Sequence, residues 1–356
     1  MHFLQSSDFI GENLQIPSRL IAINAATLLS LILSAHAVAG QKPLELIKNT
    51  PLPEVTGGDF DHFAVDLNEN RLYVPAEVYA SIEVFNLKTG EHLRSATGLV
   101  KSPHMLALMP DKKELFVADA HDASCDVFDA ADLHLLKRIA LEPGPDFGVY
   151  DDASRILYLG NGGKGARADF SYISLISVDR QEVIDRIRVD AATLKGMRID
   201  HQANRLYVNM RDKNAVGVID LASRAVVHTW TFPGLISNAA MGFDEGNHRL
   251  FIGSRNPGML YVLDSNSGKV VATLKTVNIS DDMTFDAAHR RLIVSGADGV
   301  DVFAQDNADS YRLVQHVDTL GGKTSVYVPT LKQFYVVHTK GEQAAEAGLQ
   351  IFKVND

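Results

Sequence analysis

Short runs of alternating apolar and polar residues recur along the chain, and each run follows a polar turn. The clearest is Asp200–Asn209, which reads DHQANRLYVN. Similar runs lie at Asp66–Val74, Asp151–Leu159, Asp244–Ile252 and Asp286–Val294, with looser copies at Pro110–Val117 and Pro329–Val336. The residue before the apolar pair of each copy falls at Arg71, Glu114, Arg155, Arg205, Arg249, Arg291 and Gln333. Seven copies at intervals of about 41 to 50 residues predict seven β-propeller blades.

Each repeat contains four short strand patterns separated by turn signals. In the first repeat they are His62–Asp66, Arg71–Pro75, Ser81–Leu87 and a strand that begins at His92. The turn Lys88–Gly90 places glycine where a hairpin needs a positive φ. No stretch has a sustained helical period. The sequence therefore predicts an all-β, seven-bladed β-propeller with four-stranded antiparallel blades.

The last repeat supplies only three strands, at Lys323–Pro329, Gln333–Thr339 and Gly348–Val354. Leu44–Lys48, which precedes the first repeat, has the pattern of a fourth strand. We expect it to pair with Gln350–Val354 and close the ring. Closure would also cover a strand edge that otherwise exposes unpaired backbone groups.

The repeats resemble the YVTN-repeat β-propellers of the YncE-like type. Arg71–Val74 and Arg205–Asn209 carry the resemblance, and Leu206-Tyr207-Val208-Asn209 approximates the family's Tyr-Val-Thr-Asn. The resemblance covers nearly all of the chain after the N-terminal segment. It implies the seven-bladed fold, but it implies little about activity because members of the family are functionally diverse. One YncE-like relative binds nucleic acid.

The N-terminal segment has the features of an export signal. An apolar run, Leu20–Ala35, follows Arg19 and ends in small residues that permit cleavage after Ala37 or Ala39. A run of about 16 residues is shorter than the roughly 20 that a membrane span needs. We therefore expect residues 1–39 to be a signal peptide, residues 40–356 to be one propeller domain, and the mature protein to be periplasmic or secreted in a bacterium, with no membrane span.

Net charge and cysteine content restrict the possible partners and chemistry. The chain of 356 residues has a net charge of −10, and removing Asp8, Glu12 and Arg19 with the signal leaves −9. A negative net charge does not provide the basic surface to which nucleic acids bind. Nucleic acid is therefore disfavoured as a partner without being excluded. The single cysteine, Cys125, cannot form an internal disulfide, and its strand-like surroundings favour a half-buried packing role over nucleophilic chemistry.

Counting back nine or ten positions from each marker predicts which residues meet at the mouth of the channel. This count reaches His62, His104, Asp146, Gly196, Ala240, Asp282 and Thr324, flanked by Asp59, Asp61, Asp281 and Lys323. Loops that enter the third strands lie on the same face and add Glu77, Asp119, His121, Asn161, Arg211, Arg255 and His338. We predict a ligand-binding surface there, formed by His62, His104, Asp146, Asp282, Asn161, Arg211, Arg255 and His338.

Two interpretations of this surface remain open. Imidazoles and carboxylates are suitable ligands for a divalent metal ion, so His62, His104, Asp146 and Asp282 are possible metal ligands. Propeller mouths are also polar simply because strand ends and loops face solvent. No local ligand spacing decides for a metal.

One glycine-rich loop, Asn161–Ala168, formally contains a dinucleotide-binding pattern. A strand at Tyr172–Val178 follows it, so there is no helix N-terminus to hold a pyrophosphate. The loop instead accounts for the longest interval between repeats, together with an insertion near Asp190–Thr193. Its Lys164 and Arg167 are expected to be solvated, or to contact an acidic ligand.

The sequence contains no nucleophile elbow, no H-E-x-x-H and no C-x-x-C motif. It therefore favours a monomeric binding or interaction module for a small molecule or a protein partner over an enzyme. The alternative is a metal-assisted hydrolase or lyase, similar to the lactonase-like propellers, that uses a divalent ion at the channel mouth. That alternative rests on fold analogy.

Overall fold

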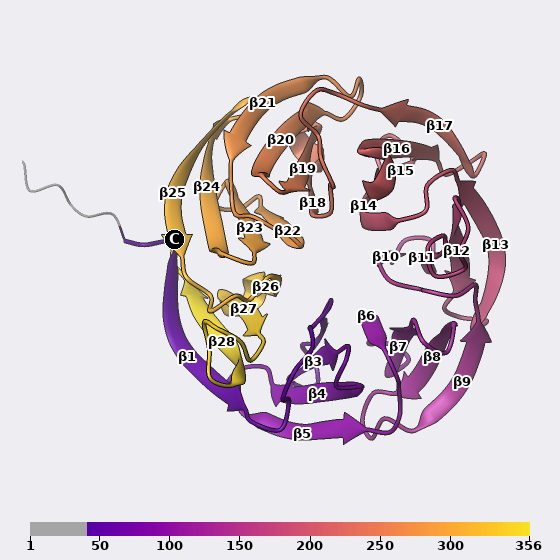
Figure 1. The fold of residues 1–356 in the computed structure, drawn as a ribbon, viewed down its shortest axis with the longest axis vertical. Helices are drawn as coiled ribbons and strands as arrows, with labels where there is room; N and C mark the ends of the chain where they lie inside the picture. Colours follow the sequence, from indigo (N-terminus) through magenta and orange to yellow (C-terminus); the bar gives the residue numbers. More distant parts are fainter. Residues whose placement is uncertain (1–40) are drawn as a thin grey trace, which may run out of the picture. The chain divides into compact units, whose positions relative to one another are not determined.

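The computed structural model describes residues 41–356, so the predicted export signal lies outside the described residues. Seven four-stranded antiparallel sheets form a closed ring (Figure 1). Blades 1 to 3 are β2 (Ala64–Asp66), β3 (Arg71–Ala76), β4 (Ser81–Asn86), β5 (His92–Thr97); β6 (Pro103–Met109), β7 (Glu114–Asp119), β8 (Ser124–Asp129), β9 (Leu135–Ala140); and β10 (Gly148–Asp151), β11 (Ile156–Gly162), β12 (Ser171–Ser177), β13 (Glu182–Val189).

Blades 4 to 6 continue in the same order from the innermost to the outermost strand. They are β14 (Leu194–Asp200), β15 (Arg205–Met210), β16 (Ala215–Asp220), β17 (Ala225–Trp230); β18 (Met241–Asp244), β19 (Arg249–Arg255), β20 (Gly258–Asp264), β21 (Val270–Lys275); and β22 (Asp282–Asp286), β23 (Arg291–Gly296), β24 (Gly299–Asn307), β25 (Ser310–Val317). Helix in the described range consists of three single 3₁₀ turns, at Arg211–Lys213, Glu245–Asn247 and Pro329–Leu331. The predicted fold class is therefore confirmed.

Blade 7 closes the ring with strands from both ends of the described chain. It consists of β26 (Thr324–Val328), β27 (Gln333–His338), β28 (Ala347–Val354) and the outermost β1 (Leu44–Leu52). β1 pairs antiparallel with β28, from Leu44 opposite Val354 to Leu52 opposite Ala347. The side chain of Gln315 in β25 also hydrogen-bonds to both backbone groups of Leu44. The predicted closing strand is confirmed, and it is longer than expected.

The recurring polar turn joins the first and second strands of every blade. In five blades an aspartate ends the first strand, and its carboxylate accepts hydrogen bonds from turn N–H groups, as Asp66 does from Asn68 and Glu69. A residue with positive φ then leads into the second strand, at Asn70, Lys113, Arg155, Asn204, His248, Arg290 and Lys332. The marker of blade 3 is therefore Ile156, where β11 begins, and the prediction of Arg155 was one residue early.

The apolar residues of the second and third strands pack between blades. Seven clusters of buried residues occur, one at each junction of neighbouring blades. Three tyrosines of the repeat motif also cross a junction: the hydroxyls of Tyr73, Tyr207 and Tyr335 donate to the backbone oxygens of Ala130, Ser265 and Leu87. Cys125 is fully buried rather than half-buried, and burial raises the pKa of its thiol, which agrees with a packing role.

Candidate functional site

The beginnings of the innermost strands bring charged residues together at one mouth of the channel. Asp61 and His62 precede β2, His104 lies in β6, Asp146 precedes β10 and Asp282 begins β22. Backbone hydrogen bonds from Asp61 to Pro75 and from Glu77 to Asp59 bring the loop after β3 alongside. The structure thus brings His62, His104, Asp146 and Asp282 to one face, where the register count predicted them.

Four of these residues form a continuous chain of contacts, which we call the histidine chain: Asp282, His62, Asp61 and His104. Nδ1 of His62 lies 3.0 Å from Oδ1 of Asp282, and its Nε2 lies 2.9 Å from Oδ1 of Asp61. The other oxygen of Asp61, Oδ2, lies 2.6 Å from Nδ1 of His104. One buried carboxylate therefore joins two imidazoles from adjacent blades.

The surroundings of the histidine chain favour its ionised form. Burial alone lowers the pKa of His62, but the Asp61 and Asp282 carboxylates outweigh it and raise that pKa well above its usual value. For His104, burial likewise lowers the pKa, but Asp61, Asp146 and Glu77 outweigh this effect, so the pKa lies above its usual value. Burial raises the pKa of Asp61, and the two imidazoles more than compensate, so this pKa lies well below its usual range.

Two further carboxylates surround His104. Oε1 of Glu77 lies 3.6 Å from its Nε2, and Oδ1 of Asp146 lies 3.7 Å from its Nδ1. Burial and the neighbouring carboxylates raise the pKa of Glu77 despite the imidazole beside it. Lys195 in β14 holds the other oxygen of Asp146 at 2.5 Å. His104 is therefore the centre of an acidic pocket.

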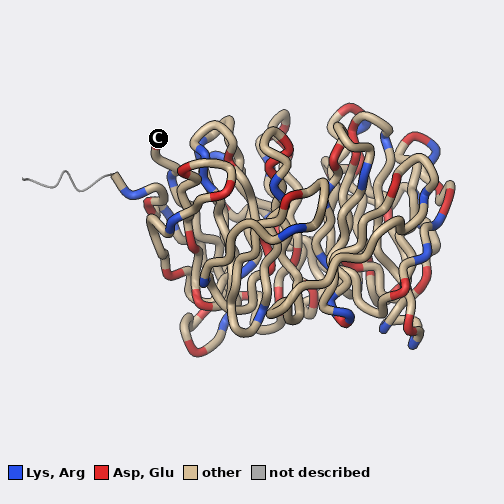
Figure 2. The backbone as a smooth tube through the Cα atoms, turned by 90° about the horizontal axis from the view of Figure 1, so that it is seen from above, with Lys and Arg blue, Asp and Glu red and all other residues tan. Residues whose placement is uncertain are grey.

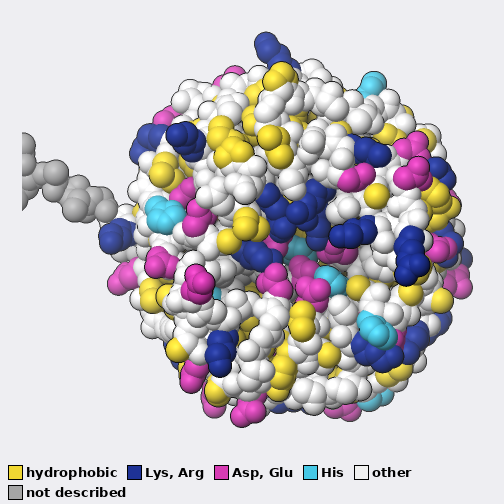
Figure 3. All heavy atoms as spheres, in the orientation of Figure 1, with side chains coloured by type: hydrophobic (Ala, Val, Ile, Leu, Met, Phe, Trp, Pro, Cys, Tyr) yellow, Lys and Arg dark blue, Asp and Glu magenta, His cyan; other side chains and the backbone are white. Residues whose placement is uncertain are grey.

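The rest of the rim carries ion pairs. Asp281 contacts Arg255 and also lies 2.8 Å from Nζ of Lys323, which is 2.7 Å from Oδ2 of Asp59. Arg211 donates from Nε to the Ser237 hydroxyl at 2.8 Å. Figure 3 shows basic, acidic and histidine side chains gathered around the centre of the ring. Seen from the side in Figure 2, acidic and basic residues are interspersed along the loops of both faces.

A cleft of about 350 Å³ opens beside His104 and Asp146. Its remaining wall consists mainly of small residues and of the glycine-rich loop: Ala120, Gly144, Gly160, Asn161, Gly162, Lys164, Gly165, Ser171, Ala192, Thr193 and Leu194. Oδ1 of Asp146 is buried and has no hydrogen-bond donor within the described part of the chain. The cleft thus has the volume of a small-molecule site and one unsatisfied acceptor in its wall.

Backbone hydrogen bonds, both within the glycine-rich loop and to neighbouring segments, fix its conformation. The N–H groups of Gly162, Lys164 and Gly165 donate to Pro143, Ala192 and Gly162, and those of Arg167 and Ala168 also bond within the loop. Gly163 has φ +54°, and a β-carbon there would lie 2.3 Å from the Ala192 oxygen. Because these amides are already engaged, they do not form a phosphate cradle, in agreement with the sequence argument.

Two predicted site residues have structural partners of their own. The buried Asn161 donates to the Leu159 oxygen and to the Ser174 hydroxyl, although it still lines the cleft. His338 does not join the histidine chain; its Nε2 lies 3.3 Å from Oδ1 of Asn49 on β1. Arg211 and Arg255 do lie on the charged rim, through the contacts given above.

Asp61, Glu77 and Lys195 are central to the site, although the register count did not select them. Asp61 directly precedes a counted residue and Glu77 lies in a loop on the same face, so both were near the prediction. Lys195 directly precedes the counted Gly196, and the register of β14 shifts between Lys195 and Met197. A bulge shifts which residue faces the channel, and no sequence motif indicates it.

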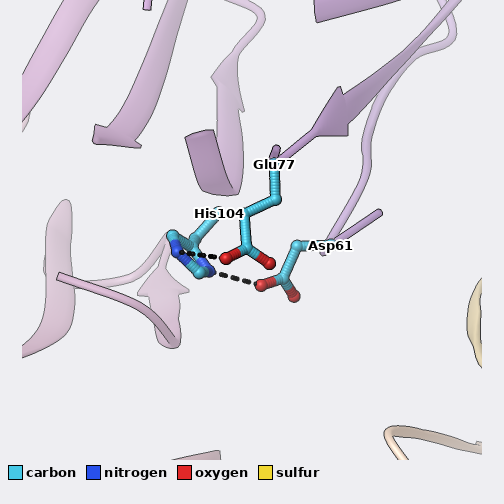
Figure 4. A group of neighbouring side chains, drawn as sticks. All are labelled: Asp61, Glu77 and His104. Atoms are coloured by element: carbon cyan, nitrogen blue, oxygen red, sulfur yellow. Dashed lines mark hydrogen bonds and ion pairs between the residues drawn. The ribbon is translucent and has the colours of Figure 1, made fainter. Parts of the chain in front are cut away.

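A cation could be coordinated by one group at the mouth. Ligand atoms of Asp61, Glu77 and His104 all lie within 4.8 Å of one another, and Figure 4 shows the two carboxylates directed toward the imidazole. Of the four predicted metal ligands, only His104 belongs to this group: His62 and Asp282 bond to each other, and Asp146 bonds to Lys195. An exposed group, Asp129, Asp132 and His134, has similar spacing on an outer hairpin.

Comparison with known proteins supports the fold. No protein-family model and no curated protein sequence matches the chain. Similar solved structures include a chain in the crystal structure of the mitotic checkpoint complex, which is 12% identical, with a TM-score of 0.72 over 98% of this chain and 99% of that one. Another is Kuenenia stuttgartiensis hydrazine synthase, 16% identical, with a TM-score of 0.65 over 82% of this chain and 94% of that one.

These likenesses support the seven-bladed β-propeller fold seen in the structure. At such identities they establish the fold alone. No helix among residues 41–356 has the length and apolar character needed to cross a membrane.

Proposed function

We propose that this chain is an exported bacterial binding protein of the YncE-like YVTN-repeat type that takes a small polar ligand at the channel mouth. The observation that carries this proposal is the cleft beside His104, where Oδ1 of Asp146 is buried without a donor. A buried acceptor without a hydrogen bond costs about 1–3 kcal/mol, and a ligand hydroxyl or amine would recover that cost. The ligand therefore carries a hydrogen-bond donor.

The charges around the cleft define the ligand further. Asp146 would accept from the ligand's donor, whereas two residues that carry positive charge, His104 and Lys164, line the same cleft. A molecule that has both a donor and an anionic or acceptor group matches this pattern better than a simple cation does. Small amino acids and hydroxy acids are the classes to test first.

Thermal unfolding and calorimetric titration of the mature protein against amino acids and hydroxy acids test this proposal. We expect a member of the panel to raise the unfolding temperature, and Asp146→Asn to weaken its binding about tenfold or more. Asp190→Asn removes an exposed carboxylate near the same loops and serves as the matched control. Binding that is unaffected by Asp146→Asn and by His104→Gln would place the ligand elsewhere.

The second candidate is a metal-assisted hydrolase or lyase, favoured by the spacing of Asp61, Glu77 and His104. These residues would hold a divalent ion, which would supply Lewis-acid activation of a carbonyl. The ion would have to displace the proton between His104 and Asp61. Metal analysis of the purified protein and of Glu77→Gln separates the two candidates, because only the enzyme requires a stoichiometric ion that this variant loses.

Export is tested separately. The apolar run after Arg19 supports cleavage after Ala37 or Ala39, with delivery to the periplasm or the medium. N-terminal sequencing of the protein from fractionated bacterial cells should begin at residue 38 or 40. A full-length N-terminus in the membrane or cytosolic fraction would contradict export.

A further inference from the structure

A second cavity, of about 230 Å³, lies in the channel and is open to solvent. Residues from the innermost strands of five blades, and from the segment just before β2 in blade 1, form its wall, so it lies on the axis of the ring. Its lining combines polar and charged residues with apolar side chains such as Phe63, Met105, Phe147 and Met283. His62 and Asp282 also line it, and it shares no residue with the cleft beside His104.

Arg198 brings a permanent positive charge into this cavity. It lies in β14, between the buried Met197 and Ile199, so strand alternation directs it into the channel. Its Nη1 donates to the Met197 oxygen at 2.7 Å and its Nη2 to the Met283 oxygen at 3.0 Å. Within residues 41–356, no carboxylate forms an ion pair with it and no other acceptor engages its remaining three N–H groups.

Asp282, whose charge acts on Arg198, already has hydrogen-bond partners. Asp282 accepts a hydrogen bond from His62 at 3.0 Å through Oδ1 and one from the Ser325 N–H at 2.8 Å through Oδ2. Burial lowers the pKa of the Arg198 guanidinium, and Asp282 compensates only in part. Arg198 is partly exposed, so its free N–H groups can reach a ligand, and guanidinium binds carboxylates through two parallel N–H groups.

We propose that the central cavity binds a small carboxylate with an apolar substituent, whose anionic head pairs with Arg198. The phenyl and thioether side chains of the wall would enclose the substituent. The cavity is larger than the roughly 150 Å³ known to admit benzene, so a short branched acid fits this space. This site is independent of the ligand proposed for the channel mouth.

The probe for the test is isobutyrate, with isobutyramide as its uncharged counterpart. Saturation-transfer NMR and calorimetric titration of the full mature protein should detect isobutyrate and give binding at least about tenfold weaker for isobutyramide. Arg198→Met, which keeps the length of the side chain, should abolish binding of isobutyrate without lowering the unfolding temperature. Arg180→Gln removes an exposed arginine of a hairpin and should bind as the wild type does.

Three results would overturn the proposal. The first is no binding of isobutyrate by the wild type. The second is equal binding of the acid and the amide, or competition by chloride as effective as that by isobutyrate, because either would remove the role of the carboxylate. The third is binding that persists in folded Arg198→Met; if that variant does not fold, Arg198→Gln provides the same comparison. Loss of the channel-mouth ligand in Asp146→Asn would leave this result unchanged.

Discussion

Asp61 and His104 belong to adjacent blades, and their side chains meet with 2.6 Å between Oδ2 and Nδ1. Asp61 also holds His62 at 2.9 Å, so one carboxylate serves two imidazoles. The contact crosses the junction between blades 1 and 2. It therefore links the chemistry of the channel mouth to the stability of the ring.

Replacing Asp61 with asparagine should destabilise the protein. The change leaves two largely buried imidazoles without their shared anion, and breaking such a pair costs about 3–5 kcal/mol. Urea denaturation should show this loss in the free energy of unfolding. Asp132→Asn breaks the exposed contact between Asp132 and His134 and should have no measurable effect. An equally stable Asp61→Asn variant would mean that the histidine chain is not ionised.

Stability should decrease as the pH rises from near neutrality. The pKa of His62 is raised in the folded state, so its contribution is complete below the unfolded pKa of about 6.5 and is lost as the pH rises through the folded pKa. His104 acts in the same direction. The lowered pKa of His338 has the opposite sign, with its contribution lost at acidic pH. The measured quantity is the free energy of unfolding across this pH range.

The His62→Gln variant isolates this effect from the other titrating groups. Its free energy of unfolding should fall less between about pH 6.5 and alkaline pH than that of the wild type. His134→Gln, at an exposed hairpin, should retain the wild-type slope. If the wild type and His62→Gln have parallel pH profiles, the pKa of His62 is not raised.

The tyrosines of the repeat make a separate contribution to the junctions between blades. Tyr335→Phe removes the buried hydrogen bond to the Leu87 oxygen and should lower the free energy of unfolding by about 1 kcal/mol. Tyr150→Phe, whose hydroxyl has only a long, exposed contact with Asp152, is the control. A variant that matches the wild type in urea denaturation would show that packing alone holds the junction.

Much of the fold could be predicted from sequence because strand alternation and turn chemistry repeat seven times. The repeated register also predicted that His62, His104, Asp146 and Asp282 lie near one another, because equivalent positions of different blades face the same channel. What it could not supply was the exact residue where a strand bulges, as at Lys195. In blade 3 the residue with positive φ is Arg155 itself, so the second strand begins one residue later than predicted, at Ile156.

The partners of each side chain were also beyond sequence reasoning. His338 follows the same loop rule as Glu77, yet it bonds to Asn49 of β1, across Gly348 of the intervening β28. Arg198 sits in an ordinary strand pattern, and only the closed ring shows that it enters the channel without a carboxylate partner. Contacts between blades depend on side-chain direction in three dimensions, which the repeat does not encode.

Ring closure by β1 gives the sharpest test of the fold. Deleting Leu44–Lys48 removes half of the pairing with β28 and exposes the edge of that strand, including the backbone opposite Phe352. It also leaves Gln315 without its partner Leu44. An unpaired, apolar edge favours intermolecular pairing, so we expect aggregation or a loss of cooperative unfolding.

Gln315→Ala alone should only lower the free energy of unfolding by about 1–2 kcal/mol, since the strand remains paired. Size-exclusion chromatography with urea denaturation distinguishes the outcomes, and a soluble, equally stable deletion variant would contradict closure by β1.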